Sequence, residues 1–247
     1  MKENNKKLLL ALFPPQNQPL WLTQAQLWRV CPQLSAAGLQ SALFGLEKAA
    51  YLLSDKQGRP WRYSLSAHGQ SFLKQQFPAL SGPSEPTAAL EQAALIIFLS
   101  APATDRNFRY LRHFLGKQQA VALTRAVFLC PHGLSELVRL ELERSYREAV
   151  LVIAAREWLF GDQLQIIGRR AGLQDLASLY SSISSETERL LAFHELEKSP
   201  MLAPKHNFNS VFDRFVSILA TDQGIIQLYF PQVVGPKTIL AQLQNKL

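Results

Sequence analysis

Short apolar segments at helical spacing open the chain. Residues 6–13 predict a first helix, which the two prolines that follow end because proline has no backbone N–H to donate. Thr23 and Gln26 have the spacing of a capping box, in which two side chains accept hydrogen bonds from the exposed amides at a helix start. A second helix is therefore predicted from Thr23 to about Cys31.

A third helix is predicted from Ser35. Leu39, Leu43 and Leu46 recur at the i, i+4, i+7 spacing that places side chains on one buried helix face. Only a short turn around Pro32 separates this helix from the second one. Two short helices joined by a tight turn are the helix-turn-helix pattern.

Two β-segments come next and predict a hairpin. Residues 51–54 and 61–65 are typical of strands, and the polar segment 55–60 between them is typical of a turn. A closing helix is predicted over 67–77. A hairpin in this position is the wing of a winged helix, so we expect a winged helix-turn-helix domain over residues 1–77.

The middle of the chain alternates strand and helix patterns. Three prolines and a glycine between Pro78 and Pro86 favour a linker, which we place at residues 78–90. Residues 91–170 then predict the order βαββαβ, the ferredoxin-like topology. The strands are expected at 93–99, 120–123, 126–130 and 149–155, and the helices at 105–117 and 134–146. The first and last of these strands are continuous apolar segments, typical of buried strands, and residues 163–167 predict a further edge strand.

The remaining residues, 171–247, predict a helical region whose longest helix begins at Leu173 and ends near Leu196. The expected fold class is therefore α+β: an N-terminal winged helix-turn-helix domain, a central ferredoxin-like domain and a C-terminal helical segment. A single winged helix rarely reads enough bases, and two-fold operators mirror two-fold proteins. We expect a homodimer whose contact lies in this C-terminal region.

Positive charge is concentrated in the first eighty residues. The whole chain has a formal net charge of +7, and residues 1–80 hold nine Lys and Arg against three acidic residues, a net charge of +6. A basic domain is typical of a protein that binds a polyanion such as double-stranded DNA, and small domains are also basic for solubility alone, so charge locates the candidate domain without identifying its partner.

The composition is that of a folded protein, with 47% hydrophobic and 18% charged residues. Cys31 and Cys130 have no spacing that suggests a metal site or a disulfide framework. The N-terminal segment lacks a signal peptide pattern, and no segment approaches the roughly 20 apolar residues of a membrane helix. We expect a soluble cytoplasmic protein without a membrane partner.

The predicted DNA-binding surface combines the third helix with the hairpin. With the leucines facing the core, the opposite side of the helix faces the major groove, while the hairpin cations face phosphates. Gln40 is the best candidate to read bases, because its amide can pair with adenine. The predicted contact residues are Gln40, Ser41, Phe44, Lys48, Lys56, Arg59 and Arg62.

Several short segments, taken in order, resemble the PaaX-like family of transcriptional regulators, named for a repressor of phenylacetic-acid degradation. They are residues 39–46, 63–69, 95–102 with the arginines at 106, 109 and 112, 127–131, and 222–231 with Gly235. The resemblance spans nearly the whole chain. The sequence departs from the family at Gln40, where the family usually has arginine, and at Val234, where it has tryptophan.

The resemblance implies a winged helix joined to a domain similar to the CRISPR-associated ferredoxin-like nuclease. It also implies a transcriptional repressor that an acyl-coenzyme A effector releases from DNA. Phosphates of such an effector need cations, and the candidates are Arg106, Arg109, Arg112, Arg169 and Arg170.

Two alternatives stay open. A metal-dependent nuclease would need a carboxylate at the end of the first strand of the middle domain, where Ser100 stands, and the nearest acid, Asp105, is explained as a helix cap. No other catalytic, metal or cofactor motif is found, so we expect no enzyme activity, no catalytic residue and no cofactor. The second alternative is a protein-interaction module that has lost its DNA contacts, suggested by the low charge of the third helix.

Overall fold

The structure is a computed structural model that describes residues 1–14, 18–58, 60–81, 93–100, 104–118, 120–155, 157, 159–196 and 208–247. It is an α+β protein with two antiparallel sheets. Contacts divide the chain into two compact units. Unit 1 comprises residues 1–81, 178–222 and 233–247, and unit 2 comprises residues 82–177 and 223–232.

The N-terminal part of unit 1 has the expected order of helices and strands. Its elements are α1 (Glu3–Ala11), β1 (Leu22–Thr23), α2 (Gln24–Val30), α3 (Ala36–Lys48), β2 (Leu52–Asp55), β3 (Arg62–Leu65), α4 (Ala67–Gln76) and the 3-10 turn η1 (Pro78–Leu80). The capping box of Thr23 and Gln26 is present. The short strand β1, which the sequence pattern did not predict, pairs with β3 and completes a sheet of order β1-β3-β2.

The C-terminal half of helix α1 is enclosed on all sides. Leu8, Leu9, Leu10, Ala11 and the cap residue Leu12 are each 0% exposed. Five consecutive buried residues cover every direction around a helix, so this end of α1 cannot lie on a surface. It packs against α2 and α4.

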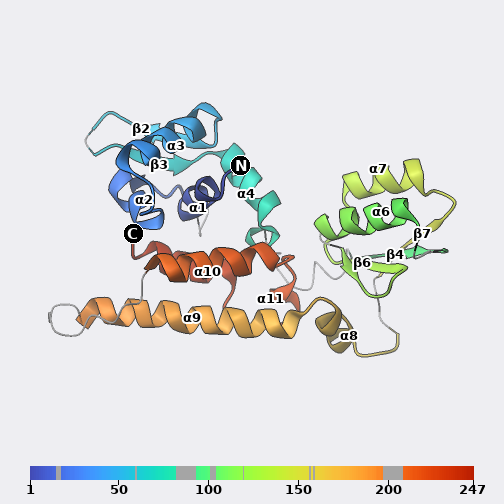
Figure 1. The fold of residues 1–247 in the computed structure, drawn as a ribbon. Coiled ribbons are helices and arrows are strands. Elements are labelled where there is room, and N and C mark those ends of the chain that lie inside the picture. The colour runs from blue at the N-terminus through green and yellow to red at the C-terminus, as the bar shows by residue number, and fades with distance from the viewer. Residues whose placement is uncertain are drawn as a thin grey trace. The chain divides into compact units, whose positions relative to one another are not determined.

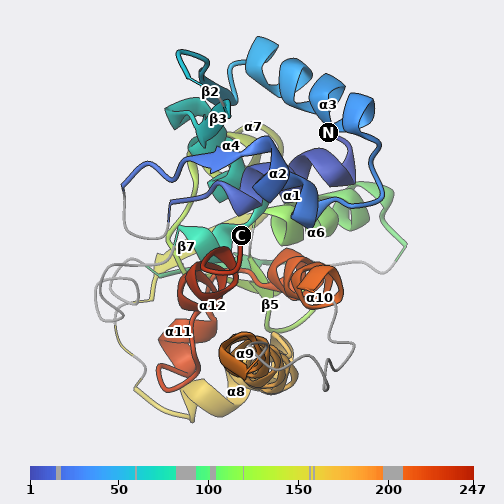
Figure 2. The same cartoon turned by 90° about the vertical axis from the view of Figure 1, so that its left-hand side faces the viewer.

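The C-terminal helices belong to the same unit as α1. They are α9 (Leu173–Leu196, within unit 1 from Ser178), α10 (Phe208–Thr221) and α12 (Pro236–Gln244). Helices α9 and α10 run side by side (Figures 1 and 2), joined by an ion pair between Glu186 and Arg214. Helix α10 packs against α2, and its Asp213 lies 2.7 Å from Lys7 of α1. Contacts in unit 1 therefore join the N-terminal region and the C-terminal helices, which the sequence analysis placed in separate domains.

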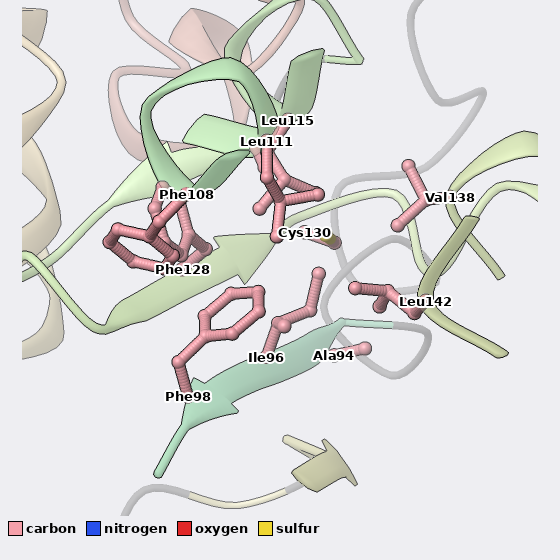
Figure 3. Close-up of a cluster of buried hydrophobic side chains, with 11 residues drawn as sticks. Ala94, Ile96, Phe98, Phe108, Leu111, Leu115, Phe128, Cys130, Val138 and Leu142 are labelled. Atoms are coloured by element: carbon pink, nitrogen blue, oxygen red, sulfur yellow. The ribbon is translucent and has the colours of Figure 1, made fainter. Parts of the chain in front are cut away.

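Unit 2 contains the predicted order β-α-β-β-α-β. Its elements are β4 (Ala94–Phe98), α6 (Arg106–Lys117), β5 (Val121–Ala122), β6 (Val127–Cys130), α7 (Glu136–Ser145) and β7 (Val150–Ala154), followed by α8 (Gln163–Arg170) and α11 (Ile226–Tyr229). All strand pairs are antiparallel, and the sheet has the order β5-β6-β4-β7. Figure 3 shows Ile96 and Phe98 of β4 meeting Phe108 and Leu111 of α6, while Leu142 of α7 closes the cluster near Ala94.

Two expectations about unit 2 are wrong. Residues 163–167 form the start of helix α8 and not an edge strand, because the Asp162 side chain caps a helix there by accepting from the Gln165 backbone N–H at 2.9 Å. The last strand, β7, is not buried: Leu151, Val152 and Ile153 are 50%, 44% and 48% exposed. Among the described strands β7 pairs only with β4 and forms one edge of the sheet, so an apolar sequence did not guarantee burial.

No helix in the described part of the chain has the length and apolar character needed to cross a membrane.

Candidate nucleic-acid interface

Local hydrogen bonds set the geometry of α2 and α3. Ser35 caps α3 by accepting from the Gly38 backbone N–H at 3.1 Å. The indole N–H of Trp28, on α2, donates to the Leu34 carbonyl in the connecting turn at 2.8 Å. These two bonds hold the turn between the helices in one conformation.

Helix α3 is amphipathic in the way its leucines predict. Leu39, Leu43 and Leu46 are at most 2% exposed. The opposite side presents the predicted contact residues Gln40, Ser41, Phe44 and Lys48, all of which are exposed. Phe44 is 66% exposed, which is unusual for a large aromatic side chain and leaves it free to touch a partner.

The hairpin cations lie in ion pairs. Lys56 Nζ is 2.9 Å from both carboxylate oxygens of Glu47, at the end of α3, and lies 5.7 Å from the centre of the Trp61 ring. Arg62 and Asp55 pair across the hairpin at 2.9 Å. Arg59, the third predicted cation, lies outside the described residues.

Glu47 connects α3 to the hairpin, a role that the sequence pattern did not reveal. Its carboxylate accepts from the Ser54 hydroxyl at 2.6 Å as well as from Lys56. These hydrogen bonds, first that of Ser54 and then that of Lys56, lower the pKa of Glu47 below its ordinary value. The pKa of Asp55 is lowered in the same way, first by the backbone N–H of Gln57 and then by Arg62. Both acids are therefore charged at neutral pH. Glu47 holds the hairpin against α3, and Asp55 joins the two strands of the hairpin through Arg62.

The candidate effector arginines lie on two helices of unit 2. Arg106, Arg109 and Arg112 are on α6, where the first two are exposed and Arg112 is half-buried. Arg169 and Arg170 end α8 and are exposed. Arg169 also lines a small pocket of about 280 Å³, whose other described lining residues are Asp162, Gln165, Gly168, Gln174 and Phe230.

The residues that the nuclease alternative depends on have other roles or surroundings. Ser100 is exposed just beyond β4. The Asp105 carboxylate caps α6 by accepting from the backbone N–H groups of Asn107 and Phe108, at 2.8 and 3.3 Å. Within the described ranges, no three His, Cys, Asp or Glu side chains lie where they could hold a metal ion.

No known protein family matches this sequence, and no curated protein matches it either. Among solved structures, the chain is similar to an uncharacterized protein from Mycobacterium tuberculosis. The two share 16% sequence identity over 97% of this chain and 96% of the other, with a TM-score of 0.48.

Proposed function

We propose that this protein is a cytoplasmic, DNA-binding transcriptional repressor of the PaaX-like kind, with no catalytic activity. The observation that carries the proposal is the joint surface of α3 and the β2–β3 hairpin. A buried leucine face fixes α3, and its outer face presents Gln40, Ser41, Phe44 and Lys48 beside the hairpin cations. This surface supports a winged helix, in which one helix enters the major groove and the hairpin lies along the backbone.

The side chains suit two kinds of contact. The Gln40 amide can form a bidentate pair with adenine, and Phe44 can touch a thymine methyl group. Lys48, Lys56 and Arg62, with Arg59, supply contacts to phosphates, which make affinity depend on salt. The proposed complex therefore combines base reading by α3 with backbone binding by the hairpin.

The ion pairs of the hairpin do not prevent such contacts. The Lys56 and Glu47 side chains are 44% and 29% exposed, and Arg62 is 55% exposed. Exposed ion pairs contribute only about 0.2 to 1 kcal/mol, so a phosphate can replace the carboxylate partner when DNA binds.

A pair of matched variants tests the proposal. Arg62→Ala removes an exposed, ion-paired arginine from the proposed surface, and Arg139→Ala removes one from α7, where it pairs with Glu136 and Glu143. Fluorescence anisotropy with duplexes selected from a random pool would measure affinity at several salt concentrations. Arg62→Ala is expected to reduce the slope of log K against log salt by about 0.9, and Arg139→Ala to leave it unchanged. Equal slopes for both variants would contradict the proposal.

For unit 2 we propose the ferredoxin-like fold, supported by the sheet order β5-β6-β4-β7 and the helices α6 and α7 on one face. We also propose that the protein acts as a homodimer and that an acyl-coenzyme A thioester releases it from DNA, with the arginines of α6 and α8 as candidate phosphate ligands. Sedimentation of the full chain tests the dimer. A drop in DNA affinity on adding phenylacetyl-coenzyme A, lost in Arg169→Ala, tests the effector.

A second candidate function is a protein-interaction module. It is favoured by exposed aromatic side chains on the same unit, since Trp28 is 49%, Phe44 66% and Trp61 39% exposed. Large exposed apolar groups mark interaction sites. Failure to bind any duplex at low salt, with a folded protein, would favour this function over DNA binding.

A further inference from the structure

A pocket of about 780 Å³ lies between the two helices and the hairpin of unit 1. Its described lining residues are Gln24, Ala25 and Trp28 of α2, Ala36 and Leu39 of α3, and Pro60 and Trp61 just before β3. Pockets that bind small molecules have volumes of about 300 to 1,000 Å³ and mostly apolar walls with a few polar groups. The size and the lining both fall in this class.

Two tryptophan side chains, Trp28 and Trp61, form part of the pocket wall. Trp28 has already used its indole N–H in the bond to the Leu34 carbonyl, so the ring offers apolar surface to the pocket. The Lys56 ammonium group lies 5.7 Å from the centre of the Trp61 ring. Two indole rings in one pocket favour a flat aromatic ligand, because offset stacking and edge contacts add to the gain from burying apolar area.

Charge indicates the class of ligand more narrowly. None of the described lining residues is charged. An ionised group in the pocket would lose hydration and would meet no charged side chain among the described lining residues, which is costly. One polar group is available, since the Gln24 amide forms no hydrogen bond to any residue of the described ranges.

We propose that this pocket binds a neutral aromatic small molecule that stacks against Trp28 and Trp61 and forms a hydrogen bond with Gln24. The pocket borders the surface that we propose to face DNA, since Ala36 lies one turn before Gln40 on α3. If that function holds, the ligand and DNA compete for the protein. This consequence rests on the proposed function, whereas ligand binding itself does not.

The test uses the neutral fluorescent probe N-phenyl-1-naphthylamine, whose emission rises in apolar surroundings, with the full chain. Ala36→Phe places a ring in the pocket, and Ala37→Phe places the same ring on the next position of α3, which is also exposed but does not line the pocket. Neither variant removes a contact of the core, and far-ultraviolet circular dichroism checks that both fold.

The unchanged protein is expected to bind the probe at one saturable site. Ala36→Phe should raise the Kd at least about tenfold, and Ala37→Phe should leave it within about twofold. Absence of saturable binding, or equal Kd values for the two variants, would overturn the pocket. A separate titration with duplex DNA distinguishes the two proposals: a protein that binds the probe as expected but no DNA retains the ligand site and loses the proposed repressor function.

Discussion

The side chain of Gln244 is predicted to stabilise the contact between α12 and the end of α1. Gln244 is 8% exposed, and its amide nitrogen donates to the Ala11 carbonyl at 2.9 Å and to the Phe13 carbonyl at 2.8 Å. Carbonyls at the end of a helix have no partner within the helix. Two prolines follow Phe13 and have no N–H to offer. Gln244, the last residue of α12, therefore supplies donors that the chain around Phe13 lacks.

The change Gln244→Met keeps a flexible side chain of similar length and removes both donors. Each buried carbonyl left without a donor costs about 1 to 3 kcal/mol. Part of this cost is offset, because the Gln244 Oε1 atom is itself buried without a partner and methionine removes it. The expected net loss in the free energy of unfolding is about 1 to 4 kcal/mol.

Gln242→Met is the matched control, two residues earlier in the same helix. The Gln242 Oε1 atom is also buried without a partner, and this amide donates no hydrogen bond to a described residue. Its replacement should be neutral or should stabilise the protein by up to about 1 kcal/mol. Urea unfolding followed by circular dichroism and tryptophan fluorescence measures both variants. Equal midpoints for the two would refute the reasoning, since Gln244 would then contribute nothing that Gln242 does not.

Two further predictions concern packing and pH. Gly69→Ala should destabilise the protein by more than about 2 kcal/mol, because a Cβ atom there would lie 2.4 Å from the Tyr51 carbonyl oxygen. Gly45→Ala, with open space around it, should raise Tm slightly. Thermal unfolding measures both variants, and similar shifts in Tm would contradict the prediction. Burial raises the pKa of the Cys31 and Cys130 thiols from 9.0 to about 11. Neither thiol should therefore react with Ellman's reagent near pH 8 until denaturant is added. Because the pKa is higher in the folded protein than in the unfolded chain, the stability that each neutral thiol contributes is complete below pH 9.0 and falls as the pH rises toward 11. Fast reaction of the folded protein with the reagent, or a free energy of unfolding that is constant across this pH range, would show that the thiols are accessible.

Much of the local structure followed from the sequence because local interactions produce it. Side-chain caps at Thr23, Ser35, Asp105 and Ser135 start helices where the spacing predicted them. Each cap joins residues at most three apart, so the pattern of types along the chain is enough to place it. The exposed face of α3 followed in the same way from the spacing of its leucines.

The candidate site was predictable only in part. Helical periodicity placed Gln40 and Phe44 on the exposed side of α3, and both are exposed. The ion pair between Glu47 and Lys56 was not predicted, because it depends on how the hairpin folds back onto the end of the helix. The pocket between Trp28 and Trp61 was missed for the same reason, since it forms only where two helices and a hairpin converge.

By itself, the sequence determined the order of helices and strands apart from β1 and α8, together with the caps and the buried face of α3, since each depends on neighbours within a few residues. Tertiary structure alone decided the enclosure of the C-terminal half of α1, the contact of Gln244 with carbonyls 233 and 231 positions away, and the exposure of β7 at a sheet edge. These features depend on which distant segments meet. Apolar periodicity shows that a side chain is suited to burial, but burial also needs a second surface, and only the folded chain provides it.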